Sequence, residues 1–230
     1  MEPKNELKNR IGFFDSDCLE WANEQSLRSR VLPEFGIRKR MQSKIDKLEK
    51  LFNFAKEHDI VQVFTHCCSA QPVQARQHPE VVVVPRDIAD QSWQAALAGR
   101  RLINIEKIHN SPLNHSFICR HFDMFQHNSN AMTLLKKLNI PTWILFGHGF
   151  DLCVDSAAKG IIAAGFHVHF LTDVTAPSAS GYGPYGTPES GKAILDYLVK
   201  IGMTTGTWDA FLQNPEQPVA STSSAAVSFH

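Results

Sequence analysis

A continuous hydrophobic run, followed by a glycine-containing loop and a small-residue helix, most constrains how this chain can fold. Residues 143–146 (Trp-Ile-Leu-Phe) have no polar break, which is typical of a strand buried on both faces. Residues 151–164 then carry apolar side chains at helical spacing, and Gly165 supplies a helix stop. A strand buried on both faces needs helices on both sides of its sheet. The segment therefore predicts an α/β architecture.

The same alternation of strand and helix continues along the chain. Short apolar runs predict strands at 11–14, 61–65, 81–84, 102–105, 117–119, 142–146 and 168–171. Amphipathic stripes predict helices at 37–56, 92–98, 129–138 and 151–164, and a last long helix with Thr187 as N-cap and Pro188 at its first position. This order predicts a mainly parallel sheet with helices on both faces, a three-layer α/β/α fold.

Length and composition fit one domain of ordinary size. A chain of 230 residues with 43% hydrophobic residues can build a single α/β domain, which we expect over residues 1–214. Residues 215–230 are rich in Pro, Ser, Ala and Thr, and they predict a flexible tail. The formal net charge is zero, so the sequence predicts neither nucleic acid nor an anionic membrane as a partner.

The cysteines and the first residues bear on the compartment. Five cysteines are an odd number, and the charged start 1–6 lacks the apolar segment of a secretory leader. No apolar run approaches the length of a membrane span. These features favour reduced thiols and a cytoplasmic location.

Chemically useful side chains follow three of the predicted strands. Asp15 ends the first strand, Cys119 and Arg120 end the strand at 117–119, and Cys153 follows the strand at 142–146. Functional groups gather beyond the carboxyl ends of parallel strands. There a carboxylate can shuttle the proton of a thiol, and a cation can hold both groups in place. Singly, each residue also fits a structural role, as a turn former, a solvated arginine or an inert cysteine.

Cys153 lies where a helix is expected to begin. The positive end of the helix dipole and the nearby backbone N–H groups favour thiolate over thiol, and the thiolate is the nucleophile. The alternative is a small buried cysteine that packs between helix and sheet. The sequence leaves both interpretations open.

Two segments resemble the isochorismatase-like cysteine hydrolases, which include nicotinamidases, N-carbamoylsarcosine amidases and ureidoacrylate amidohydrolases. Residues 147–154 (Gly-His-Gly-Phe-Asp-Leu-Cys-Val) and the small residues after them resemble the nucleophile motif of that superfamily. Residues 171–175 (Leu-Thr-Asp-Val-Thr) are close to the Asp-Ala strand ending that follows it. Residues 13–17 (Phe-Phe-Asp-Ser-Asp) resemble the opening motif, in which Asp15 is the better match and Asp17 the fallback. The resemblance covers roughly residues 10–213.

The resemblance implies a cysteine-dependent hydrolase of a small amide, imide or related C–N substrate. It implies Cys153 as nucleophile and Asp15 as catalytic acid/base. The oxyanion hole would be formed by the backbone N–H groups of Cys153 and Gly149, the latter exposed by a cis peptide bond between His148 and Gly149. It also implies a small-molecule substrate as partner, a homo-oligomer and no cofactor.

The catalytic lysine of the family has no direct match. It follows a strand, and the corresponding stretch here places Cys119 or Arg120 at its position. Arg120 keeps the positive charge but not the compact ammonium. Lys107 is the next candidate, although it precedes the strand predicted at 117–119. Because this lysine is unmatched, a non-hydrolytic member that binds a small molecule or a protein partner is kept as an alternative to the hydrolase.

The sequence predicts no required metal. Residues 65–69 (Thr-His-Cys-Cys-Ser) do not fit the Asp-x-His motif with which some nicotinamidases bind one. A nucleotide-binding doubly wound domain is a further alternative, but no Gly-x-Gly-x-x-Gly follows a strand. The residues expected to line a substrate pocket are Trp21, His66, Cys119, His121, Phe125 and His148.

Overall fold

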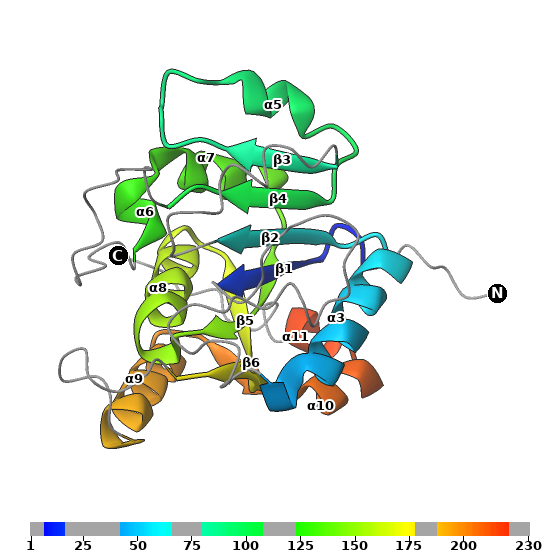
Figure 1. The fold of residues 1–230 in the computed structure, drawn as a ribbon. Coiled ribbons are helices and arrows are strands. Elements are labelled where there is room, and N and C mark those ends of the chain that lie inside the picture. Colours follow the sequence, from blue (N-terminus) through cyan, green and yellow to red (C-terminus); the bar gives the residue numbers. More distant parts are fainter. Residues whose placement is uncertain (1–6, 17–41, 66–79, 108–122, 178–187, 221–230) are drawn as a thin grey trace.

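The described part of the chain contains one sheet of seven parallel strands (Figure 1). The computed structural model describes residues 7–16, 42–65, 80–107, 123–177 and 188–220. The strands are β1 (Ile11–Ser16), β2 (Val61–Thr65), β3 (Val81–Val84), β4 (Leu102–Ile105), β5 (Thr142–His148), β6 (His167–Ala176) and β7 (Thr204–Gly206). Their order across the sheet is β3-β4-β2-β1-β5-β6-β7, and all neighbouring pairs are parallel. The predicted parallel α/β fold is confirmed.

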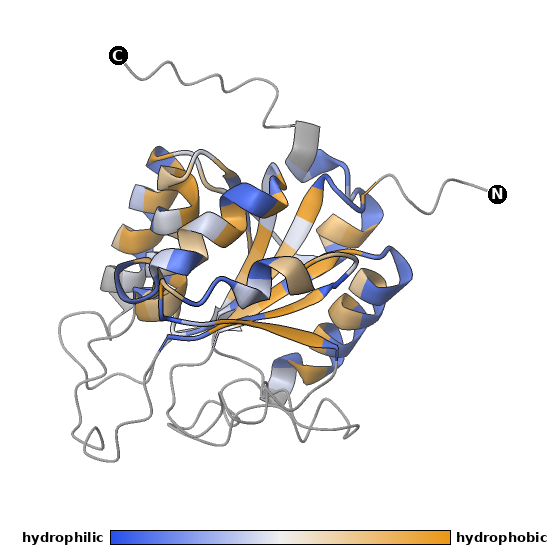
Figure 2. Ribbon diagram, turned by 90° about the horizontal axis from the view of Figure 1, so that it is seen from above, coloured by the Kyte–Doolittle hydropathy of each residue, from blue (hydrophilic) through white to orange (hydrophobic). Residues whose placement is uncertain are grey.

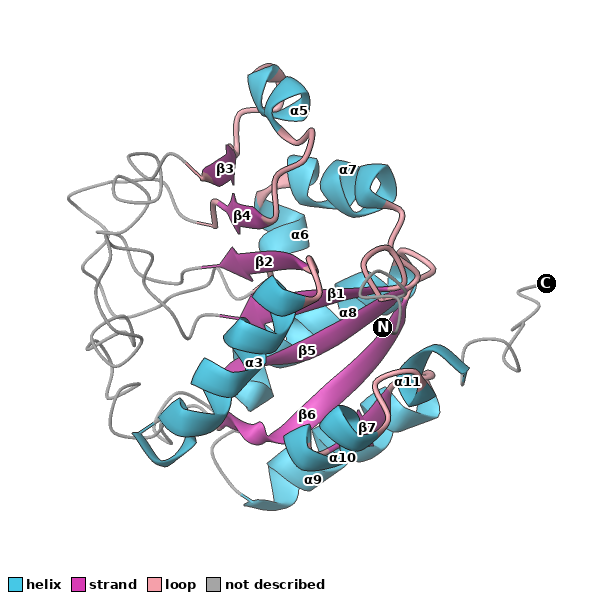
Figure 3. Cartoon of the chain, turned by 90° about the vertical axis from the view of Figure 1, so that its right-hand side faces the viewer, coloured by secondary structure: helices cyan, strands magenta, loops and turns pink. Residues whose placement is uncertain are grey.

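Helices cover both faces of this sheet. They are α3 (Ile45–Glu57), α5 (Ser92–Ala96), α6 (Met124–His127), α7 (Ser129–Leu138), α8 (Asp155–Ala163), α9 (Pro188–Lys200), α10 (Trp208–Gln213) and α11 (Gln217–Ala220). A 3-10 turn (Gln42–Lys44) precedes α3, and a π-helical turn (Phe150–Val154) precedes α8. In Figure 3, α3 crosses in front of β1 and β5, while α6 and α8 lie behind the sheet. Among the described helices, none is both long and apolar enough to cross a membrane.

Alternate residues of each central strand serve opposite cores. Phe13 packs on the face covered by α3 and α10, with Leu48 and Trp208. Phe14, the next residue, packs on the other face with Leu134 of α7. Figure 2 shows the largely apolar strands as a middle layer between helices in which hydrophilic and hydrophobic residues alternate. Two covered faces explain why the central strands read as continuous hydrophobic runs.

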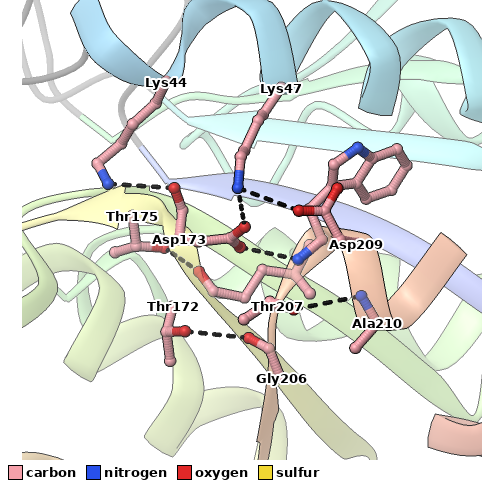
Figure 4. Close-up of polar contacts among 11 residues, drawn as sticks. Lys44, Lys47, Thr172, Asp173, Thr175, Gly206, Thr207, Asp209 and Ala210 are labelled. Carbon is pink, nitrogen blue, oxygen red and sulfur yellow. Dashed lines mark hydrogen bonds and ion pairs between the residues drawn. The ribbon is translucent and has the colours of Figure 1, made fainter.

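A polar junction at Asp173 of β6 joins the two helices of one face (Figure 4). Its carboxylate accepts hydrogen bonds from the Lys47 ammonium at 2.6 Å and from the backbone N–H of Trp208 at 2.8 Å. The Lys44 ammonium donates to the backbone oxygen of Asp173 at 3.1 Å. The hydrogen bond to Asp173 raises the pKa of Lys47. The junction therefore ties the start of α3 and the start of α10 to the same strand.

Several predicted elements appear with changed limits. The helix at 129–138 is found as predicted, whereas the helix at 37–56 is described from the turn at 42 onwards. The strand predicted at 117–119 lies outside the described residues. The chain also extends in regular structure past the predicted domain end at 214. Glu216 forms an ion pair with Arg10, and α11 follows it. The division into a domain over residues 1–214 and a flexible tail over 215–230 stays a prediction.

Candidate active site

Three chemically useful side chains follow strands of the central sheet at its carboxyl edge. Asp15 is the fifth of the six residues of β1, Lys107 follows β4, and Cys153 follows β5. Because all strands are parallel, these positions lie at the same edge of the sheet. Asp15 and Lys107 are each 2% exposed, and Cys153 is 5% exposed. An acid, a cation and a thiol are thus all buried along one edge.

Asp15 occupies the middle of this arrangement. Its Cα position pairs with Phe64 of β2 on one side and with Phe146 of β5 on the other. Neighbouring strands lie about 4.8 Å apart, so β4 and β1, on either side of β2, are about 10 Å apart. A long side chain such as lysine covers much of that distance. Lys107 and Cys153 follow strands that lie on opposite sides of β1, the strand that carries Asp15.

Lys107 gains weight as a candidate from its place in the fold. From the sequence it was the second choice, because it precedes the strand predicted at 117–119, but the structure places it two residues after the end of β4. A buried ammonium is costly unless an anion and hydrogen-bond acceptors surround it. The apolar run 102–105 was recognised as a strand or edge segment, and this strand ending was the signal that pointed to Lys107.

Two glycines shape the turn between β5 and Cys153. Gly147 has φ +141°, and a Cβ there would clash with the backbone oxygen of Ser16. This close approach holds the ends of β1 and β5 together beside Asp15. Gly149 adopts a left-handed conformation with φ +74°, in which a Cβ would lie 3.7 Å from the backbone nitrogen of Cys153. Glycine at both positions lets the chain turn sharply and place Cys153 over the end of β5.

The helix predicted at 151–164 begins with a π-helical turn, because one carbonyl serves two donors. The Gly149 oxygen accepts hydrogen bonds from the N–H groups of Leu152 at 2.9 Å and Val154 at 3.1 Å. The wider turn contains Cys153 and leads directly into α8. Cys153 thus lies at the positive end of a helical segment, where a thiolate is favoured. It is a free thiol and the one cysteine within the described residues.

The expectation of a cis bond between His148 and Gly149 is wrong. Both residues are described, and the described residues contain no cis peptide bond. The N–H of Gly149 instead donates to the oxygen of Ala176 at 3.0 Å, which prolongs the pairing of β5 with β6. In this geometry the Gly149 N–H serves the sheet and does not form half of an oxyanion hole.

Acidic groups flank Cys153 in its own helical segment. Asp151 is buried in the π-helical turn, and Asp155 is the first residue of α8. Burial raises the pKa of Asp155, while its hydrogen bond from Lys159, at 2.7 Å, opposes that shift. Neither acid was singled out from the sequence, where both resembled ordinary first-turn residues of a helix.

The predicted pocket residues divide into two groups. His148 is buried at the end of β5, next to the turn that carries Cys153. Phe125, by contrast, packs against Gly160 of α8, where a Cβ would clash with its ring, and so takes part in the core between α6 and α8. Five predicted site residues lie outside the described residues: Trp21, His66, Cys119, Arg120 and His121.

No group of three or more metal-ligating side chains occurs among the described residues. His66 and its neighbours 67 and 68 lie outside that part of the chain. The prediction that no metal is required therefore stays a prediction.

Comparison with solved structures identifies the fold. The nicotinamidase of Staphylococcus aureus matches with a TM-score of 0.51 at 12% identity, over 86% of this chain and 99% of that one. An isochorismatase-like hydrolase from Alkaliphilus metalliredigens matches with a TM-score of 0.50 at 18% identity, over 89% and 98%. An octameric hydrolase of unknown specificity from Escherichia coli matches with a TM-score of 0.51 at 16% identity, over 97% and 90%. The chain therefore has the isochorismatase-like fold, as its motifs predicted.

Comparisons at the level of sequence give no further assignment. No family model matches the chain, and no curated protein matches it. The likeness is thus one of architecture, and the function has to be argued from the residues at the carboxyl edge.

Proposed function

We propose that this protein is a cysteine hydrolase of a small amide or a related C–N compound. The observation that carries the proposal is the burial of Asp15, Lys107 and Cys153 along one edge of a sheet with the isochorismatase-like fold. Buried ionisable groups of three different kinds are costly to a fold and are frequent at active sites. The sharp turn after β5, which requires Gly147 and Gly149, positions the Cys153 thiol at the end of that strand.

Each of the three side chains has a role in this proposal. Cys153, as thiolate, attacks the carbonyl carbon of the substrate and forms a tetrahedral intermediate. Asp15 takes the thiol proton and delivers it to the leaving nitrogen, so that an amine or ammonia departs and a thioester remains. Water then attacks the thioester, with Asp15 as base, and releases the carboxylic acid and the free thiol. The charge of Lys107 keeps Asp15 ionised between these steps.

Lys107 replaces Arg120 as the proposed cation. Its support is its position after β4 and its burial, whereas Arg120 lies outside the described residues. The alternative of a non-hydrolytic binding protein was motivated by an unmatched lysine. A buried lysine at the carboxyl edge supports the hydrolase over that alternative.

The oxyanion hole of this proposal relies on the backbone N–H of Cys153 at the start of the helical segment. The Gly149 N–H, bonded to Ala176, contributes only after that bond is broken. A substrate that enters between β5 and β6 would have to separate these two residues. Cys153 is thus the one backbone donor that the proposal assigns to the oxyanion hole.

A screen for amine or ammonia release from small carboxamides tests this function. Nicotinamide is the first compound to try, since one structural neighbour is a nicotinamidase. We expect one compound to be hydrolysed by the native protein and not by Cys153→Ala or Lys107→Ala, with Arg120→Ala retaining activity. Equal turnover by the native protein and Cys153→Ala would refute the proposal.

We further propose that the chain forms a homo-oligomer. The support is the octameric hydrolase among its structural neighbours. Light scattering after size-exclusion chromatography measures the molar mass in solution, and a value of one chain would contradict this proposal.

A further inference from the structure

Two buried asparagines mark the beginning of α7. Asn128 is 0% exposed and Asn130 is 1% exposed. The side-chain amide of Asn128 donates to the backbone oxygens of Val84 at 3.1 Å and Glu106 at 2.9 Å. That of Asn130 donates to the backbone oxygens of Pro85 at 2.9 Å and Asp87 at 3.0 Å. Both side chains therefore fasten backbone segments that follow β3 or β4.

Asn128 acts on the peptide that leads into Lys107. The oxygen of Glu106 belongs to the peptide bond between Glu106 and Lys107, and that bond is planar. The N–H of Glu106 is also held, since it donates to the oxygen of Val84 at 3.1 Å. Both ends of residue 106 are thus tied to the sheet and to α7. Fixing this peptide plane fixes the position of the Lys107 Cα and so limits the directions in which its side chain can leave the backbone.

Asn128 adds a restraint where β4 ends. Glu106 comes directly after Ile105, which belongs to the last described residue pair of β2 and β4. The amide of Asn128 offers two donors, and it uses them for the oxygen of Val84, at the end of β3, and the oxygen of Glu106.

We propose that Asn128 is a positioning residue that aims the Lys107 ammonium at the carboxyl edge occupied by Asp15. This inference rests on the proposed function, since it assigns Asn128 a role only through Lys107. Asn128 touches no reacting atom. Its effect on chemistry passes through the orientation of the Glu106–Lys107 peptide.

Asn130 provides a matched control in the same helix. It is equally buried and donates the same number of amide hydrogen bonds, but its acceptors, Pro85 and Asp87, follow β3 and lie outside the lysine segment. Substitution of either asparagine removes two buried hydrogen bonds, and only substitution of Asn128 releases the peptide before Lys107. A merely structural role would make the two substitutions alike.

The test compares Asn128→Ser and Asn130→Ser with Lys107→Ala. Serine keeps the oxygen that caps α7, which Asn128 supplies to the N–H of Asn130 at 3.0 Å, and removes the amide. The readout is the rate of iodoacetamide alkylation at Cys153 from mildly acidic to alkaline pH, measured by mass spectrometry and needing no substrate. Removing the ammonium in Lys107→Ala should raise the thiol pKa by about one unit and slow alkylation at neutral pH about tenfold.

We expect Asn128→Ser to slow the alkylation of Cys153 roughly twofold to threefold, about one third of the effect of Lys107→Ala on a logarithmic scale. Asn130→Ser should match the native profile. A profile unchanged by Lys107→Ala refutes the proposed function itself. A shift with Lys107→Ala, together with equal profiles for the two serine variants, overturns only the role of Asn128.

The isosteric variant Asn128→Asp serves if Asn128→Ser does not fold. It keeps the capping oxygen and the shape while removing both donors, so the same slowing is expected. If it also fails to fold while Asn130→Ser folds, the role of Asn128 is structural and the proposal is overturned.

Discussion

Two polar regions of the molecule use the same kinds of side chain in opposite ways. At the junction of Figure 4, Asp173 accepts hydrogen bonds from Lys47 and from the backbone of Trp208, and the lysine lies at the surface. At the carboxyl edge, Asp15 and Lys107 are almost completely buried. The junction ties helices α3 and α10 to β6, whereas the residues of the edge come from the ends of separate strands. A fold gains little from burying such charges, so their burial points to chemistry.

The two regions also differ in how many parts of the fold supply their side chains. Lys47 lies on α3 and Asp173 on β6, and one hydrogen bond of 2.6 Å joins their side chains. Asp15, Lys107 and Cys153 come from three different strand ends and depend on the sheet order β4-β2-β1-β5. A change at the edge should therefore affect activity, and a change at the junction should affect stability.

The largest expected effect is the loss of turnover at the edge. Once a substrate is found, Cys153→Ala and Lys107→Ala should each lower kcat/KM by about a thousandfold or more, since nucleophile and cation act as a unit. Lys47→Ala, which removes a lysine from the junction, is the matched control and should leave kcat/KM within about twofold. Steady-state kinetics with circular dichroism as a check of folding would measure this, and equal losses in Lys107→Ala and Lys47→Ala would break the comparison.

The second largest effect is expected from adding a methyl group at Gly147, where β1 and β5 lie in close contact. Gly147→Ala places a Cβ against the backbone of Ser16 at a strained φ, and we expect a loss of about 3 kcal/mol in the free energy of unfolding. Gly165→Ala is the control, because it has φ +89° but open space around it, and it should cost only about 1 kcal/mol. Urea unfolding of both variants decides, and similar losses would mean that the close approach is unimportant.

The junction itself is expected to matter to stability alone. Asp173→Ala removes the carboxylate that accepts from Lys47 and from Trp208, and we expect a loss of about 2 kcal/mol on unfolding. The alkylation rate of Cys153 should remain within about twofold of the native value in this variant. Thermal unfolding measures the stability, and mass spectrometry measures the alkylation rate. A large change in the alkylation rate would show that the junction influences Cys153, against our account.

The smallest effect is expected at a third ionic cluster, near the opposite end of the strands. Hydrogen bonds from Arg101, and then from Lys8, lower the pKa of Asp59 to about 2. Because the folded-state pKa lies below the ordinary value, this stabilisation is present above about pH 4 and is lost as the pH falls towards 2. Asp59 is partly exposed, so the contribution is below about 1 kcal/mol.

Chemical denaturation of the native protein and Asp59→Asn checks this pH dependence. The difference in the free energy of unfolding between them should be constant near neutrality and should shrink between pH 4 and pH 2. A difference that stays the same at pH 2 would show that the ion pairs do not contribute through ionisation.

Much of the fold could be predicted from the sequence because the central strands carry strong hydrophobic patterns. The run 143–146 and the helix at 129–138 are clear because covered strands and packed helices demand apolar residues. β7 was missed because its sequence, Thr-Thr-Gly, is short and polar at an edge of the sheet. The π-helical turn at 150–154 could not be anticipated, since it depends on how one carbonyl is shared.

The candidate site was predicted in part for the same reason. Asp15 and Cys153 stood out because each follows a strong apolar strand and carries a motif. Lys107 was ranked below Arg120 because a strand expected at 117–119 seemed closer to the family pattern. The hydrogen bond from Gly149 to Ala176 was not foreseen, because it joins residues distant in sequence.

The reactivity of Cys153 tests the central claim most directly. If Asp15, Lys107 and Cys153 form one site, the rate of Cys153 alkylation by iodoacetamide in the native protein should already be near its plateau at neutral pH, and Lys107→Ala should shift the rise towards alkaline pH. The account is contradicted if Cys153 of the native protein reacts only above pH about 8.5, the pKa of an ordinary thiol, and if Lys107→Ala follows the same curve.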